Sequence, residues 1–398
     1  MKATSQVAIL AQARGDKIGV PEEEGPMAVP LLDLAAQHEA IAAEVEAKVL
    51  SVLRSGRYIL GPCVAEFERL AALECNTPHA LGVSSGTDAL LIALQALGVG
   101  PGHEVIVPAF SFFATAGSVY RVGARPVFAD IDPATFNLDP SSLARHIGPK
   151  TRAVIPVHLF GQCADMVAIN EIAAAHGLYV IEDAAQAFGA EHLSRRAGSL
   201  GHVGCFSFFP SKNLGGAGDG GLVTTLDASL HERMTMLRVH GASRRYHHEL
   251  VGGNFRLDEI QAAILSVKLK YLPAWTEARR RNAAYYRERL QDLALEGLLV
   301  LPIEAEGRRH IFNQFTIRVP SRRDEVVSRL RAAQVGTEIY YPVPLHLQPC
   351  FAHLGGKAQD CPEAERASQE VLSLPVHPYL TQSQLDEVCD ALRAALRP

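Results

Sequence analysis

The sequence of 398 residues has no long hydrophobic run and no stretch that resembles a complete secretory signal. A transmembrane helix needs ~18 or more consecutive apolar residues, but Pro108, Ser111 and Thr115 interrupt the most apolar segment, 105–120. The apolar stretch near the N-terminus, 7–11, is shorter than the ~7–15 residues of a signal core. We therefore expect no membrane partner and a cytoplasmic location.

The chain also lacks an excess of basic residues and a paired cysteine motif. It has 38 basic and 43 acidic residues and a net charge of -5, whereas a general nucleic-acid binder needs a basic face. The seven cysteines are scattered without a C-x-x-C pair, which favours reduced thiols over disulfides or a zinc site. His247-His248 has no third ligand at a recognisable spacing. We expect neither a nucleic-acid partner nor a metal.

What is present is the composition of a globular protein, with 48% hydrophobic and 20% charged residues. At roughly 100–200 residues per domain, the length predicts two or three domains. Residues 1–26 lack periodicity and are expected to form a mobile tail. A helix is predicted over 36–54, and Gly56 is expected to stop it.

Short apolar runs then alternate with helical stretches such as 87–97 and 166–176, which predicts βαβ units. We expect an α/β fold with a mostly parallel seven-stranded sheet flanked by helices in a large domain, 27–270. The seven candidate strands are 80–84, 104–107, 125–128, 153–157, 179–181, 205–208 and 222–225.

The pattern changes after residue 270 and predicts a smaller α+β domain over 271–398. Its expected elements are helices over 271–288, 321–333 and 381–396, and strands over 312–319 and 337–341. The helix over 321–333 would open on a Ser-x-x-Asp start, and the last helix on a capping box formed by Thr381 and Gln384.

Two segments in the large domain carry polar residues where a strand should end. Ser84-Ser85-Gly86-Thr87-Asp88 follows a strand and opens a helix, so it is either a seat for a phosphate or a plain helix cap. Glu182 and Asp183 end a buried run at the carboxyl end of a strand, where open α/β sheets bind ligands. An acid at this place could hold a heteroaromatic nitrogen, a ribose or a metal, or could cap a helix. A buried His158 is expected to be a satisfied core histidine.

The third segment places Lys212 between Phe208-Phe209 and a run of glycines that reaches Gly221. Desolvation of such a lysine favours the neutral amine, which is a nucleophile towards carbonyls. A phosphate seat, an acid for a pyridinium nitrogen and a reactive lysine are together what a pyridoxal phosphate enzyme requires.

The sequence resembles the DegT/DnrJ family of sugar-nucleotide aminotransferases, which are fold type I pyridoxal phosphate enzymes. The resemblance covers nearly everything from Val29 to Leu396. It rests on seven segments in order: SSGTDAL (84–90), PAFSFFAT (108–115), VHLFGQCADM (157–166), EDAAQAFG (182–189), FSFFPSKN (206–213), GNFRLDEIQAA (253–263) and YYPVPLHLQ (340–348).

The resemblance implies a cofactor, pyridoxal 5'-phosphate, bound as a Schiff base on Lys212 and passing through pyridoxamine phosphate. Lys212 would also move the proton, and Asp183 would keep the pyridine nitrogen cationic. Phe112 would stack on the ring, and Gln186 would lie beside the phenolic oxygen, where many members have His.

The phosphate would be bound by Gly86, Thr87 and Ser207, and by Asn254 of a neighbouring subunit, which implies a homodimer with shared sites. Arg256 would face the carboxylate of the amino donor. Tyr341 and His346 would contact the nucleotide-sugar. The family pattern commonly has proline where Cys163 stands, and residues 1–26 have no counterpart in it.

The implied reaction transfers the amine of L-glutamate to a nucleotide-linked keto-sugar, a 3-keto hexose by the segment 336–346, for glycan or secondary-metabolite biosynthesis. A 4-keto sugar aminotransferase is the alternative within the class. A pyridoxamine-dependent dehydratase is disfavoured, since a histidine replaces the lysine in that branch. A non-catalytic regulatory protein that binds the cofactor is the alternative outside enzymes.

Overall fold

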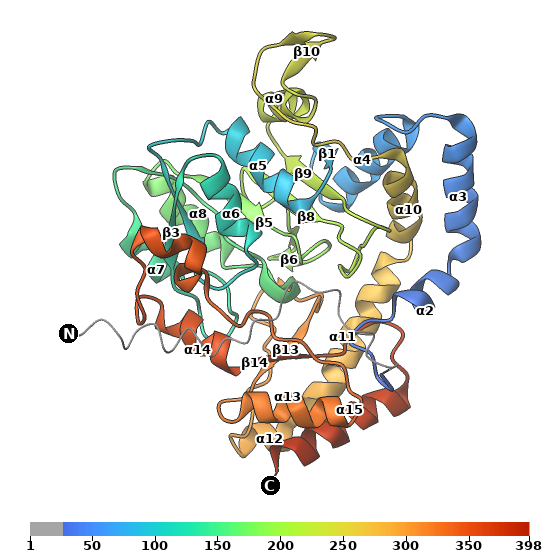
Figure 1. Cartoon of the computed structure of the whole chain (residues 1–398), viewed down its shortest axis with the longest axis vertical. Coiled ribbons are helices and arrows are strands. Elements are labelled where there is room, and N and C mark those ends of the chain that lie inside the picture. The colour runs from blue at the N-terminus through green and yellow to red at the C-terminus, as the bar shows by residue number, and fades with distance from the viewer. Residues whose placement is uncertain (1–26, 398) are drawn as a thin grey trace, which may run out of the picture.

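The computed structural model describes residues 27–397, and a seven-stranded sheet lies at its centre (Figure 1). The strand order is β1-β9-β8-β5-β4-β2-β3, and within this sheet β9 runs antiparallel to both neighbours while the other pairs are parallel. The expected α/β fold is confirmed, and each predicted strand of the large domain overlaps an observed one. The bounds are β1 His79–Val83, β2 Glu104–Pro108, β3 Arg125–Ala129, β4 Thr151–Val154, β5 Tyr179–Asp183, β8 Val203–Ser207 and β9 Gly221–Thr225.

Helices cover both faces of the sheet because successive strand residues point to opposite sides. On β2, Val105 and Val107 pack with the helices of one face, and Ile106 packs with those of the other. The first face carries α5 (Gly86–Ala96), α6 (Ala114–Arg121) and α9 (Ala228–Arg238). The second carries α4 (Pro62–Glu74), α7 (Pro140–His146), α8 (Met166–Ala175) and α10 (Glu259–Leu269).

The C-terminal part has its own core, around an antiparallel pair of strands (Figure 1). Val29 from the start of the described chain packs in the same core and pairs with Val335. The predicted capping box of Thr381 and Gln384 is confirmed, whereas the boundary at residue 270 stays a prediction. The elements are α11 Leu272–Arg289, α12 Gln291–Leu295, β13 Phe315–Arg318, α13 Arg323–Ala332, α14 Pro362–Glu370, β14 Val371–Leu374 and α15 Gln382–Leu396.

Short elements complete the described chain. A small sheet joins β6 (Glu191–His192), β7 (Arg195–Arg196) and β12 (Arg308–Arg309). A hairpin of β10 (Ala242–Arg244) and β11 (His247–His248) projects beyond α9 at the top of Figure 1. Short 3-10 helices lie at Leu159–Gly161, Leu345–Leu347 and Pro349–Leu354.

The single helix predicted over 36–54 is wrong, since two helices occupy this segment, α2 (Leu34–Glu39) and α3 (Ala42–Ser55). The helical backbone is interrupted at Ile41, and the Ile41 side chain packs with Val267 and Trp275. The predicted stop is confirmed, because Gly56 ends α3 with a positive φ of 64°.

Two details of the C-terminal part are also corrected. No strand forms over 337–341, where Glu338 makes a single bridge to Ser373 and its side chain accepts the Ile339 N–H at 2.8 Å. This local bond competes with a strand ladder. Ser321 does not cap α13. The residue before this helix is Arg322, which has a left-handed backbone conformation and makes no side-chain capping hydrogen bond. The tail predicted over 1–26 lies outside the described residues.

Candidate active site

The buried carboxylate of Asp183 stands at the carboxyl end of β5, in the middle of the sheet. Its Oδ2 accepts a hydrogen bond of 2.7 Å from Thr115 Oγ1, and Oδ1 accepts a longer one of 3.3 Å from the Ala185 N–H. Burial raises the pKa of Asp183, while these hydrogen bonds and the positive charge of Lys212 act in the opposite direction. The carboxylate retains acceptor capacity for a further donor.

Thr115 was not predicted as a site residue, although it ends the motif PAFSFFAT. It lies in the first turn of α6, and its own hydroxyl lies 2.9 Å from Ser111 Oγ. Because the Thr115 proton goes to Asp183, Ser111 donates to Thr115 in a buried chain of two hydroxyls and a carboxylate. The contact joins residues 68 positions apart, so no local pattern reveals it.

Lys212 lies in the turn that follows β8, with its side chain half-buried. The turn is tight, since the Lys212 N–H donates to Phe209 O at 2.9 Å and a Cβ added at Gly215 would lie 2.3 Å from Pro210 O. Burial lowers the pKa of Lys212 to about 8, against the attraction of Asp183. An amine with this pKa is neutral often enough at neutral pH to attack a carbonyl.

The N-terminus of α5 lies beside the end of β8 and forms the predicted phosphate seat. Ser85 caps the helix by accepting the Asp88 N–H, which leaves other first-turn N–H groups without helical partners. A Cβ added at Gly86 would lie 2.7 Å from Ser207 Cβ, so glycine is required for this close approach. Gly86, Thr87 and Ser207 are therefore brought together at an anion-binding helix terminus.

Phe112, Gln186 and Tyr341 form a second group at the same edge of the sheet. Gln186 Nε2 donates to the Tyr341 hydroxyl at 3.1 Å, and Gln186 Oε1 accepts the Phe160 N–H at 2.7 Å. Burial and the charge of Asp183 raise the pKa of Tyr341, which keeps its phenol protonated. The centre of the Phe112 ring lies 6.2 Å from that of Tyr341, and Phe112 is 58% exposed.

Asn254 and Arg256 lie on the segment between β11 and α10, next to the end of β1. Arg256 bridges to Val83 and the Ser84 N–H donates to Phe255 O at 3.1 Å, so the segment runs beside the phosphate seat of its own chain. Asn254 is exposed, and Arg256 Nε is buried without a hydrogen-bond partner among the described residues. The predicted roles of both side chains stay predictions.

His346 is not brought into this group. Its ring is buried, its Nε2 lies 3.1 Å from Glu365 Oε1, and Nδ1 has no partner among the described residues. It lines a separate cavity of about 260 Å³ beside β3, together with Phe128 and Cys361. The predicted contact with a nucleotide-sugar finds no support in this geometry and stays a prediction.

Behind the site, Glu182 forms a buried polar cluster that the sequence did not identify. Its carboxylate accepts four hydrogen bonds, from His158 Nε2 (2.9 Å) and from the N–H groups of Gly198, Leu200 and Gly201 (each 2.7 Å). His158 Nδ1 accepts the Ala164 N–H, so this histidine is the satisfied core residue that was expected. The cluster fixes the end of β5 from the side opposite to Thr115.

These residues fit pyridoxal phosphate feature by feature. With the cofactor bound, Lys212 would face its aldehyde, Asp183 its ring nitrogen and Phe112 its ring face, and the helix terminus at Gly86 and Ser207 would receive its phosphate. The cradle at Gly86 is one that a Cβ would fill, and the carboxylate is buried and hydrogen-bonded. Fold and site together define an aminotransferase of fold type I.

The comparisons give the family. The model of the DegT/DnrJ/EryC1/StrS aminotransferase family matches residues 39–393, and the chain belongs to this family. A relative from Geobacillus stearothermophilus, called "Pleiotropic regulatory protein", is 51% identical over 92% of this chain and 98% of its own. A relative from Acidithiobacillus ferrooxidans, a UDP-N-acetyl-3-dehydro-alpha-D-glucosamine 3-aminotransferase, is 45% identical over 93% and 98%.

Solved structures agree with this assignment. The crystal structure of S. venezuelae DesV in complex with a ketimine intermediate matches with a TM-score of 0.90 and 45% identity, over 94% of this chain and all of that one. NtdA from Bacillus subtilis, with the bound cofactor PMP, matches with a TM-score of 0.88 and 32% identity, over 94% and 87%. Among residues 27–397, no helix is long and apolar enough to span a membrane.

Proposed function

We propose that this protein is a pyridoxal phosphate-dependent aminotransferase that moves the amine of L-glutamate onto a nucleotide-linked 3-keto hexose. The observation that carries the proposal is the meeting of Asp183, Lys212 and the N-terminus of α5 at one edge of the sheet. Pyridoxal phosphate, when bound, supplies an electron sink for the carbon that loses its proton.

The residues of the chain have separate tasks in this reaction. Lys212 would hold the cofactor and would carry a proton to and from the reacting carbon. Asp183 provides the negative charge that keeps a ring nitrogen protonated. Phe112 would cover the cofactor ring. Gln186 and Tyr341, which are hydrogen-bonded to each other, would supply polar groups on the side where Phe160 lies.

The 3-keto position is proposed from the relatives, since the A. ferrooxidans protein is a 3-aminotransferase of a UDP-sugar. The nucleotide, UDP or dTDP, is left to the experiment. We also propose that the enzyme works in the cytoplasm and that its amino-sugar product serves a glycan or a secondary metabolite.

The test is a two-stage reaction of the purified holoenzyme. L-Glutamate should bleach the visible absorption of the bound cofactor, and a 3-keto sugar nucleotide should restore it, with the aminated carbon located by NMR. Lys212→Ala should lose both stages. Restoration by 4-keto sugars alone would move the assignment to the other carbon.

A regulatory role is a second candidate, because the G. stearothermophilus relative carries that name. The assembled site argues against a scaffold without activity, since regulation alone does not require a reactive lysine beside a buried acid. A protein that binds the cofactor yet shows neither bleaching nor turnover with any donor would favour this second candidate.

We further propose a homodimer whose sites are shared, with Asn254 completing the phosphate seat of the partner. Its exposure in the single chain is the supporting observation. Lys212→Ala and Asn254→Ala subunits, each inactive alone, should regain about a quarter of the wild-type activity when co-assembled, because half of the dimers then hold one intact site. Activity no higher than that of the separate variants would show that each site lies within one subunit.

A further inference from the structure

A buried arginine that forms no ion pair with the residues that the structure describes lies on α11, outside the groups already described. Arg279 is 4% exposed, and its Nη1 donates to two backbone carbonyls, Phe312 O at 3.3 Å and Asn313 O at 3.4 Å. Both bonds are long for N–H···O pairs. Burial lowers the pKa of Arg279 to about 10, and no acidic group of the described part of the chain opposes this shift. Buried charges are nearly always paired, but within residues 27–397 this guanidinium contacts only neutral acceptors.

The next residue on the helix shows the usual arrangement. Arg280 Nη1 donates to Glu304 Oε1 at 2.7 Å and forms an ion pair with it. Arg279 has no such carboxylate among the described residues, which leaves its guanidinium available for an anion.

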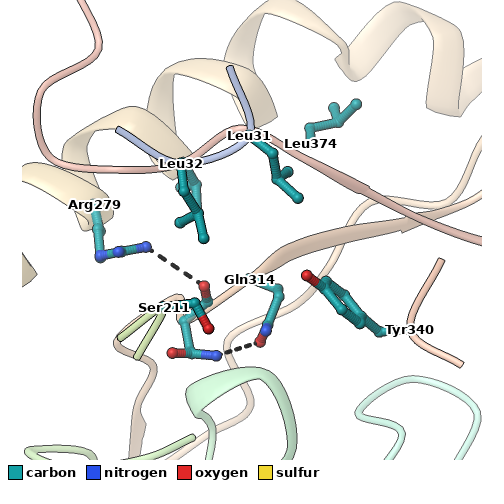
Figure 2. A pocket seen from close by; sticks show the side chains of 9 residues that line it. Leu31, Leu32, Ser211, Arg279, Gln314, Tyr340 and Leu374 are labelled. Carbon is teal, nitrogen blue, oxygen red and sulfur yellow. Dashed lines mark hydrogen bonds between the residues drawn. The ribbon is translucent and has the colours of Figure 1, made fainter. Parts of the chain in front are cut away.

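Arg279 points into a small cavity that reaches the turn carrying Lys212. Figure 2 shows the guanidinium directed from α11 toward the space above Ser211, with Leu31 and Leu32 closing the other side. The polar lining is completed by Asn313, Gln314 and Tyr340, and among the residues that line the cavity Arg279 alone is charged.

The polar lining favours an anion with two oxygens. Burial raises the pKa of Tyr340 to about 12, so its phenol stays a neutral donor, and the Ser211 hydroxyl is a second donor. The planar guanidinium fork matches a carboxylate in a bidentate arrangement. The cavity of about 20 Å³ has room for one small group rather than for a phosphorylated sugar.

We propose that Arg279 binds a carboxylate of the amino donor and selects acidic donors. Ser211, which lines the cavity, directly precedes Lys212. The cavity therefore adjoins the turn that carries the reacting amine. This site rests on the proposed aminotransferase function, and it differs from the role expected for Arg256.

The experiment measures binding of glutarate to the holoenzyme by calorimetry, because glutarate has the two carboxylates but no amine to react. Glutaramide, of the same length and without charge, is the matched ligand. The variants are Arg279→Met and Arg279→Lys, and Arg289→Met removes a charge from the exposed end of the same helix as a control.

Arg279→Met should bind glutarate about 10- to 100-fold more weakly, as expected for loss of hydrogen bonds to charged groups. Arg279→Lys should bind glutarate severalfold more weakly, since an ammonium cannot form the bidentate pair. Arg289→Met should bind glutarate as the wild type does. Without glutarate, Arg279→Met should melt at the same temperature or higher, because it removes an unpaired buried charge. A purely structural role predicts a lower melting temperature with unchanged glutarate affinity.

Unchanged glutarate affinity in Arg279→Met or Arg279→Lys overturns the proposal, and so does equal wild-type affinity for glutarate and glutaramide. If Arg279→Met does not fold, Arg279→Lys and the two ligands decide. Turnover with an unchanged KM for L-glutamate in Arg279→Met removes this site and leaves the proposed function. If the wild type shows no turnover but Arg279→Met loses glutarate binding, the site is retained and the proposed function is removed.

Discussion

Removal of the Thr115 hydroxyl tests whether the buried chain at Asp183 supports catalysis. In Thr115→Val the shape is kept, but the hydrogen bond of 2.7 Å to Asp183 Oδ2 is lost. Burial already raises the pKa of Asp183, and the Thr115 hydrogen bond opposes this shift, so the variant should raise the pKa further and weaken the carboxylate as a partner for a cationic ring nitrogen. A hydrogen bond to a charged group contributes about 1.5–3 kcal/mol.

Since 1.36 kcal/mol corresponds to a factor of ten in rate, the bleaching by L-glutamate should slow by roughly 10- to 100-fold in Thr115→Val. Stopped-flow absorption of the holoenzyme measures this rate without a sugar substrate. Thr115→Ser keeps the hydroxyl and should stay near the wild type. Ser111→Ala removes the neutral hydroxyl that contacts Thr115 and should slow the bleaching by less than about tenfold. A Thr115→Val rate within about twofold of the wild type refutes the role of this hydroxyl.

Two further predictions follow from buried groups of the same region. Because burial lowers the pKa of Lys212 to about 8, its neutral fraction rises with pH only below that value. The rate of covalent attachment of pyridoxal phosphate to the cofactor-free protein should therefore rise about tenfold per pH unit and level off near pH 8; a rise that continues toward pH 10 would indicate an ordinary lysine. Glu182→Gln places an amide where the carboxylate accepts four hydrogen bonds, so denaturant unfolding should show a loss of about 2–5 kcal/mol. A loss below about 1 kcal/mol would contradict the structural role of this cluster.

Elements with a strong local signal were predicted from the sequence. The strands of the main sheet are short apolar runs, and α5 begins at Gly86, inside the segment 84–88 that was expected to open a helix. The residues of the site that follow directly from such elements, Asp183 at a strand end and Lys212 in a glycine-rich turn, were therefore predictable as well.

The sequence did not show features that depend on distant contacts. The strand expected over 337–341 has a suitable composition, but a side-chain bond from Glu338 replaces its ladder. Thr115 and Asp183 are 68 residues apart, and the carbonyls that Arg279 contacts lie 33 and 34 residues along the chain. His346 lies 3.1 Å from Glu365 Oε1 and lines a cavity apart from the Lys212 turn, so its predicted contact with a nucleotide-sugar stays a prediction.

The adjacent carboxylates of Glu182 and Asp183 show how the fold assigns a role that the sequence leaves open. Because successive residues of a strand point to opposite faces, β5 directs the two side chains into different environments. Glu182 meets four donors and is fully satisfied, so it can only hold structure. Asp183 meets one short donor and one long one, so it alone retains the capacity to accept a proton donor from a ligand. The satisfied acid fixes the strand end, and its neighbour remains available for chemistry.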